Sequence, residues 1–249
     1  MGDPQNDSSY LRRGANAREG ALGVSRCEDT VSTLRLSLSL RIAFDLDGVL
    51  ADMGSALADQ TKALFGKAGG SGPSGSAPSP QHAAAGDADP APAPAGLDLT
   101  PRQRRKLWRQ VAGIENFWQT LAEIEPGAVK RLAAVSANQK WQVIFLTRRP
   151  ETAGLSAQAQ SQRWLVSQGF ERPSVYVVQG SRGRIAAALE LDVVVDDLPE
   201  NCCDVIVESG ARAFLVWREP GRRYSATVDR LGVRVVGTMS ECLDRLVQM

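Results

Sequence analysis

The stretch LRLSLSLRIAFDLDG, residues 34–48, decides the fold that we expect for this chain. It begins with alternating apolar and polar residues and becomes continuously apolar at Ile42, Ala43 and Phe44, which is typical of a strand entering a buried sheet. The strand is expected to end at Asp45, and Asp47 and Gly48 follow almost at once. Two carboxylates therefore lie at the end of a strand that the sheet buries.

The second half of the chain alternates strand patterns with helix patterns. Strands are expected at 141–147, 174–179, 192–197 and 212–217, and helices at 156–169, 182–191 and 201–210. An edge strand at 233–237 and a closing helix at 239–249 are expected after them. This alternation with short connections favours an α/β fold, with a parallel sheet covered by helices on both faces.

Two polar segments set the expected domain boundaries. Residues 1–33 lack periodicity, so we expect a flexible leader there. Residues 54–139 form an insertion after the first strand, with helices expected at 55–65, after Thr100-Pro101 and after Glu125-Pro126. The Gly, Pro, Ala and Ser-rich part of this insertion, about 69–96, is expected to be disordered. Residues 34–53 and 140–249 then form the core domain.

Composition excludes several kinds of chemistry. The only histidine, His82, lies in the segment expected to be disordered, which argues against histidine triads and histidine-rich metal sites. The four cysteines, at 27, 202, 203 and 242, fit neither a disulfide framework nor a zinc site, and none has the arginine spacing of a cysteine phosphatase loop. Neither GxxxxGKS nor GxxxxGKT occurs. Catalysis would have to use carboxylates.

Charge and hydropathy limit the expected partners. Lys and Arg number 29 against 28 Asp and Glu, so net charge gives no reason to expect specific nucleic-acid binding. No apolar run approaches the ~20 residues of a membrane span, and we expect a cytoplasmic protein without a membrane partner. The sequence does not indicate an oligomeric state.

Polar residues follow three of the expected strands where those strands end. Asp45 and Asp47 follow the first, Thr147 ends the second, and Asp196 and Asp197 end a third. Each alone could be a turn or cap residue, but ligands of such sheets bind at the carboxyl ends of the strands. Carboxylates crowded there repel one another unless a cation compensates them. An oxygen-only set of this kind suits Mg²⁺.

The stretches FDLDGVLAD (44–52), IFLTRRP (144–150) and VVVDDLPEN (193–201) resemble the ordered signature of the haloacid dehalogenase-like (HAD) phosphatase superfamily. The resemblance spans 41–217 and implies a HAD-like Rossmannoid parallel sheet, with a small helical cap inserted after the first strand. Within that superfamily, the chain is most similar to the 5'(3')-deoxyribonucleotidase-like group. This narrower resemblance rests on ENFWQTLAEIEPGAV (115–129), LTRRP and the DDxPEN form.

The resemblance implies a Mg²⁺-dependent phosphomonoester hydrolase. Asp45 would attack phosphorus to give an aspartyl-phosphate, and Asp47 would act first as acid and then as base. Mg²⁺ would be held by Asp45, the backbone carbonyl of Asp47 and one of Asp196 and Asp197, with Asp197 favoured as the direct ligand. Asn201 would orient the metal shell.

The resemblance also implies a phosphate-binding set. Thr147 would donate its hydroxyl to a phosphoryl oxygen, and a lysine usually lies at a later helix start. GSRGRIAAAL (180–189) has no lysine, so Arg182 or Arg184 must serve, and the sequence does not choose between them. Arg148 and Arg149 receive only a weak phosphate-binding role, because consecutive arginines in a loop are more often exposed.

Substrate identity stays open at this point. Trp108, Phe117 and Trp118 of the insertion could stack a nucleobase, but at helical spacing we favour a role in the core of the cap. The expected partner is a small phosphorylated substrate, with a nucleotide as one candidate. The alternatives are another phosphometabolite, or a non-catalytic phospholigand-binding module of the same fold.

Overall fold

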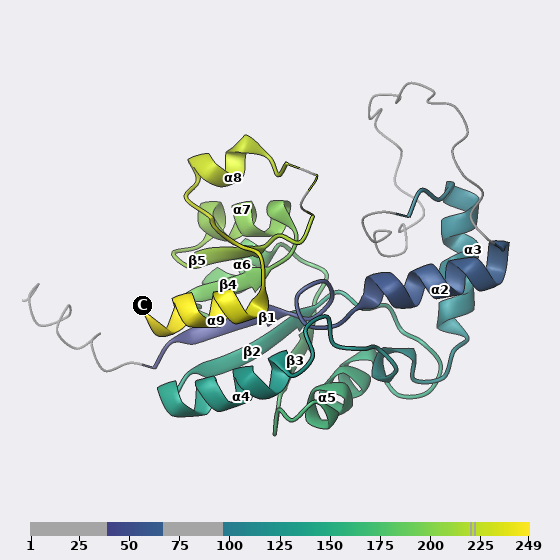
Figure 1. Ribbon diagram of the computed structural model, residues 1–249, viewed down its shortest axis with the longest axis horizontal. Coiled ribbons are helices and arrows are strands. Elements are labelled where there is room, and N and C mark those ends of the chain that lie inside the picture. Colours follow the sequence, from purple (N-terminus) through teal and green to yellow (C-terminus); the bar gives the residue numbers. More distant parts are fainter. Residues whose placement is uncertain (1–38, 67–96, 220, 222) are drawn as a thin grey trace, which may run out of the picture. The chain divides into compact units, whose positions relative to one another are not determined.

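Figure 1 shows the computed structural model, which describes residues 39–66, 97–219, 221 and 223–249. All of them belong to one compact unit, Ser39–Met249. The expected leader (1–33), the beginning of the first strand pattern (34–38) and the expected disordered segment (about 69–96) lie outside the described residues.

The described residues contain a six-stranded, entirely parallel sheet in the order β3-β2-β1-β4-β5-β6. The strands are β1 Arg41–Asp45, β2 Gln142–Thr147, β3 Ser174–Val177, β4 Val193–Asp196, β5 Arg212–Val216 and β6 Arg234–Val236. Because β2 and β3 extend the sheet to one side of β1 and the later strands extend it to the other, the strand order reverses between β1 and β4. The expected α/β fold class is confirmed, and this reversal is where such sheets bind ligands.

Helices connect the strands as the sequence predicts. They are α2 Met53–Phe65, α3 Pro101–Ala112, α4 Ala128–Gln139, α5 Ala157–Ser167, α6 Arg182–Ala188, α7 Pro199–Glu208, α8 Ala226–Arg230 and α9 Met239–Val247, with a 3-10 turn, η2, at Phe117–Gln119. The start of α3 follows the predicted cap: Thr100 and Gln103 form a reciprocal capping box and Pro101 opens the helix. The sequence did not predict η2 and α8, which are three and five residues long.

The sheet separates two apolar cores, because alternate residues of each strand face opposite sides. Ile42 and Phe44 of β1 face a core that includes residues of α4, α5 and α9, whereas Ala43 faces a second core with residues of α6, α7 and α8. Helices therefore cover both faces of the sheet, as expected (Figure 1). None of the helices in the described ranges is long and apolar enough to cross a membrane.

Candidate functional site

Three polar side chains end neighbouring strands at the reversal point. Asp45 ends β1, Thr147 ends β2 and Asp196 ends β4, and β1 pairs directly with both of the other strands. All three are buried, with Asp196 and Thr147 fully inaccessible to solvent. Burying three polar side chains at the strand ends costs free energy of folding unless each one has a partner.

The loop after β1 lies tightly against the acidic pair at the end of β4. Gly48 has a φ of +84°, and a β-carbon at this position would overlap the carboxylate of Asp197. Only glycine combines that backbone conformation with so close an approach. The structure therefore brings Asp45, Asp47, Asp196 and Asp197 together, from two stretches of sequence about 150 residues apart.

Arg182, in the first turn of α6, supplies a positive charge to this acidic group. Its Nη2 lies 2.5 Å from Oδ1 of Asp45, and its Nε lies 3.4 Å from Oδ2 of Asp196. The side chain is buried, and its Nη1 has no hydrogen-bond partner among the described residues. Since a buried donor without a partner is costly, Nη1 is suited to an anionic ligand.

Arg184 lies on a different side of the same helix. Its side chain is 82% exposed, and its Nε lies 3.3 Å from Oε1 of Glu208. The sequence left Arg182 and Arg184 as alternatives, and the structure brings only Arg182 to the carboxylates. Surface ion pairs such as Arg184–Glu208 contribute little to stability.

Asp47 accepts hydrogen bonds from Thr147, the last residue of β2, and from Arg149, which follows that strand. Thr147 Oγ1 donates to Oδ2 of Asp47 at 3.0 Å, so in this structure the threonine hydroxyl contacts a carboxylate. Arg149 donates from Nε to Oδ2 at 2.9 Å and from Nη2 to Oδ1 at 2.7 Å. The expectation that Arg149 would be solvent-exposed is wrong: it is only 1% exposed, because Asp47 and neighbouring groups satisfy its guanidinium.

Arg148 points away from this pair. It is exposed, and its Nη2 donates to the backbone oxygen of Gln179 at 3.4 Å. Of the two consecutive arginines, the structure thus gives the exposed surface position to Arg148 and the buried position to Arg149.

Asn201 orients Asp196 rather than Asp197. Its Nδ2 lies 3.0 Å from both carboxylate oxygens of Asp196, and the backbone N–H of Leu198 donates to Oδ1 of Asp196 at 2.9 Å. The neighbouring Cys202 is completely buried, with Sγ 3.6 Å from the backbone oxygen of Phe214. This agrees with a packing role for Cys202.

The site carries more negative charge than its arginines neutralise. Burial raises the pKa of Asp45 well above its usual range, and the charge of Asp196 raises it further, against the opposing effect of Arg182. Burial and Asp196 likewise raise the pKa of Asp197. Burial raises the pKa of Asp196 as well, although Arg182 opposes the change. A bound cation would favour the ionised form of all three groups.

The donor chemistry of the site fits a hard divalent cation. Only oxygen ligands are at hand, and Mg²⁺ prefers carboxylate and carbonyl oxygens. Across the described part of the chain, no three His, Cys, Asp or Glu side chains already form a ligand set in this structure. A bound cation would therefore draw on backbone oxygens and solvent in addition to the carboxylates, as Mg²⁺ usually does.

A third arginine, Arg218, fixes the loop after Asp47, and the sequence did not point to it. Arg218 follows β5 and donates from Nη1 to the backbone oxygen of Gly48 at 2.5 Å and from Nη2 to that of Val49 at 3.2 Å. Its Nη2 also lies 2.5 Å from Oε1 of Glu125. Because β5 ends at the same edge as β1 and β4, the position of Arg218 two residues after the strand was the signal that could have identified it.

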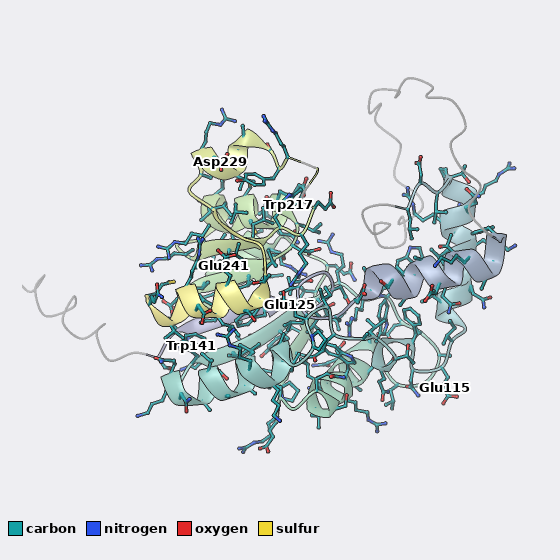
Figure 2. All side chains as sticks on the ribbon, viewed as in Figure 1. Glu115, Glu125, Trp141, Trp217, Asp229 and Glu241 are labelled. Atoms are coloured by element: carbon teal, nitrogen blue, oxygen red, sulfur yellow. The ribbon has the colours of Figure 1, made fainter. Side chains whose placement is uncertain are left out.

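Glu125, which Figure 2 labels, joins Arg218 to the start of α9. It accepts hydrogen bonds from the backbone N–H groups of Met239 at 2.7 Å and Ser240 at 3.2 Å. Burial alone would raise the pKa of Glu125, but the hydrogen bonds from Arg218 and from these two backbone groups outweigh it and lower the pKa. The carboxylate thereby links α9 to the loop that follows the first strand.

The aromatic residues of the insertion are buried. Trp108, Phe117 and Trp118 are each at most 5% exposed, and Trp118 packs 5.0 Å from Phe117 and 6.5 Å from Trp108, between ring centroids. Their placement agrees with the favoured core role and leaves no free ring face for a nucleobase. Trp118 also donates from Nε1 to the backbone oxygen of Pro150 at 2.9 Å.

Solved structures with the same fold include a HAD family hydrolase and a putative β-phosphoglucomutase. A HAD family hydrolase from Deinococcus radiodurans, solved with bound phosphate and sodium, is 17% identical, with a TM-score of 0.50 over 84% of this chain and 96% of that chain. A putative β-phosphoglucomutase from Thermotoga maritima is 15% identical, with a TM-score of 0.50 over 84% of this chain and 99% of that chain. No protein-family model and no curated protein matches the chain. At such identities the likeness shows the fold, and function must be argued from the site.

Proposed function

We propose that this chain is a Mg²⁺-dependent phosphomonoester hydrolase that forms an aspartyl-phosphate at Asp45. The observation that carries the proposal is the buried contact of Arg182 with Asp45 and Asp196, at the point where the strand order reverses. The proposed nucleophile Asp45, the guanidinium of Arg182 and the acidic pair of β4 meet there, although they are far apart in the sequence. Such a costly buried group is the kind of feature that catalysis requires.

The two carboxylates at the end of β4 have different contacts, which suit them to different roles. Asp196 is already engaged by Arg182, Asn201 and the N–H of Leu198, whereas no described side chain donates a hydrogen bond to Asp197. We therefore assign Asp197 as the direct Mg²⁺ ligand, together with Asp45 and the backbone carbonyl of Asp47. When bound, Mg²⁺ would supply positive charge that stabilises the phosphoryl oxygens.

Two steps complete the reaction. A carboxylate oxygen of Asp45 attacks phosphorus and the bond to the leaving oxygen breaks, while Asp47 protonates that oxygen. Asp47 then takes a proton from water, which attacks phosphorus and breaks the bond to Asp45. Arg182 holds Asp45 in place through Nη2, and its Nη1 can donate to a phosphoryl oxygen. To donate to a phosphoryl oxygen, the Thr147 hydroxyl would have to leave Oδ2 of Asp47, to which it donates in this structure.

The substrate class is a small phosphorylated molecule. The phosphate bound to the D. radiodurans hydrolase and the phosphosugar activity named for the T. maritima protein support such a ligand. A deoxyribonucleotide is the more specific candidate, based on the resemblance of residues 115–129 and of the LTRRP and DDxPEN stretches to the nucleotidase-like group. Because the three aromatic rings of the insertion are buried, a nucleobase would have to be recognised by other groups.

A substrate panel tests this proposal. Phosphate release is measured from deoxyribonucleotides, ribonucleotides, sugar phosphates and an activated aryl phosphate, each with Mg²⁺ and with excess chelator. We expect Mg²⁺-dependent turnover that Asp45→Asn abolishes. The matched control is Asp59→Asn on α2, since Asp59 is exposed and forms a surface ion pair with Lys62.

Three outcomes would contradict the proposal. Full activity in Asp45→Asn would exclude the assigned nucleophile. Halide release from a haloacid without any phosphate release would place the chain among the dehalogenating members of this fold. Thermal stabilisation by a phosphorylated metabolite with no turnover across the panel would support the non-catalytic binding module.

A further inference from the structure

Arg149 has more fixed contacts than a structural ion pair needs. Its Nε and Nη2 bind the two oxygens of Asp47, and its Nη1 donates to Oγ of Ser161 at 2.9 Å. The guanidinium also lies over the ring of Trp118, with Cζ 5.0 Å from the ring centroid. Ser161 is itself fixed, because its hydroxyl donates to the backbone oxygen of Ala157 at 2.7 Å.

These contacts leave little freedom for the arginine. Ser161 lies on α5, Trp118 lies on η2 and Asp47 follows β1, so three separate elements hold one guanidinium. A planar fork with two parallel hydrogen bonds fixes both the position and the plane of the carboxylate that it binds. The side-chain orientation of Asp47 is therefore set by residues outside the acidic group.

The hydrogen bonds engage both oxygens of Asp47. Oδ2 accepts from Nε of Arg149 at 2.9 Å and from Thr147 at 3.0 Å, and Oδ1 accepts from Nη2 at 2.7 Å and from Nε at 3.1 Å. A carboxylate offers about four lone-pair positions, two on each oxygen. The contacts use both oxygens, so they fix the orientation of the whole carboxyl group.

We propose that Arg149 is a positioning residue that fixes the orientation of the Asp47 carboxyl group for proton transfer to the leaving group. This inference rests on the proposed phosphohydrolase function. Arg149 contacts neither substrate nor metal in this account. It acts through Asp47, and Ser161 and Trp118 act through Arg149.

The dependence of rate on the leaving group separates this role from a merely structural one. An activated leaving group such as dinitrophenolate departs without a proton, whereas an alkoxide needs one. The value of kcat/KM reports the step that breaks the bond to the leaving group. Misplacing the acid should therefore slow alkyl phosphates far more than dinitrophenyl phosphate, whereas a general structural defect should slow both equally.

The experiment compares Arg149→Lys with wild type, both as full chains with Mg²⁺ and with folding checked by thermal unfolding. Lysine keeps the charge but loses the fork. We expect kcat/KM to fall by about 10²-fold or more for an alkyl phosphate, the usual size of a general-acid contribution, and by less than about tenfold for dinitrophenyl phosphate. Arg163→Lys, an exposed arginine on α5, is the matched control and should resemble wild type.

Ser161→Ala keeps the inference testable if Arg149→Lys does not fold. It removes one hydrogen bond from Nη1, so the same leaving-group selectivity should appear with a smaller amplitude. An equal loss for both substrates in either folded variant, or wild-type rates in both, would overturn the role of Arg149. Absence of phosphatase activity in the wild-type chain would instead refute the proposed function, so the two failures can be told apart.

Discussion

Replacing Gly48 with alanine tests whether the loop after β1 depends on its contact with Asp197. The backbone φ of +84° alone should cost about 1–2 kcal/mol for a residue with a β-carbon. The added methyl would also overlap the Asp197 carboxylate, and relieving an overlap of this kind costs about 1–3 kcal/mol more. We expect Gly48→Ala to destabilise the chain by about 2–5 kcal/mol and to displace a proposed Mg²⁺ ligand, which should lower activity.

Gly127 provides the matched control. Its φ of 83° is almost the same, but nothing lies within 4 Å of a β-carbon built there. Gly127→Ala should therefore show only the backbone cost, about 1–2 kcal/mol. The difference between the two variants isolates the contact with Asp197.

A double-mutant cycle with Asp197→Ala completes the test, with the free energy of unfolding measured by urea denaturation. When the carboxylate is absent, the cost of Gly48→Ala should fall to about that of Gly127→Ala. An equal cost for Gly48→Ala in the presence and absence of Asp197 would refute the inferred overlap. A cost no larger than that of Gly127→Ala would refute it as well.

Two further predictions follow from the arginines and from Glu125. Arg182→Lys should keep part of the activity and Arg182→Ala should abolish it, whereas Arg184→Ala should leave kcat/KM near wild type. The reason is that only Arg182 reaches the carboxylates. Steady-state kinetics on one phosphate ester checks this, and a larger loss of kcat/KM in Arg184→Ala than in Arg182→Ala would contradict it. The folded-state pKa of Glu125 is lowered, so its stabilising contribution is present above the usual glutamate value of 4.5 and is lost as the pH falls through the folded value. Urea midpoints should therefore fall less steeply with decreasing pH in Glu125→Gln than in wild type, and parallel profiles would argue against the link to Arg218 and α9.

The sequence was sufficient to predict the sheet and the acidic edge. Apolar strand runs such as Ile42–Phe44 and Val193–Val195 end in aspartates, and parallel strands place their carboxyl ends together. Local patterns of this kind do not depend on distant parts of the chain. The caps also follow from local chemistry, as at Thr100.

The buried arginines could not be predicted in the same way. Arg182 and Arg184 are two residues apart in one helical turn, so they point to different sides, and only the packing of α6 decides which side faces Asp45. Arg149 is buried because Asp47, about 100 residues earlier, and Ser161 satisfy its guanidinium. The general tendency of arginine to be exposed does not take into account the groups that could bind its guanidinium, and only the folded chain brings those groups together.

Locating the phosphoryl group on the enzyme during turnover tests the proposed nucleophile directly. The wild-type chain is mixed with a rapidly cleaved phosphomonoester and Mg²⁺ and quenched in acid. Borohydride then reduces the acyl phosphate to homoserine with release of phosphate, and the peptide that carries homoserine is identified by mass spectrometry. We expect modification at Asp45, and none in Asp45→Asn. Modification at another residue, or steady turnover with no phosphorylated enzyme and undiminished activity in Asp45→Asn, would contradict it.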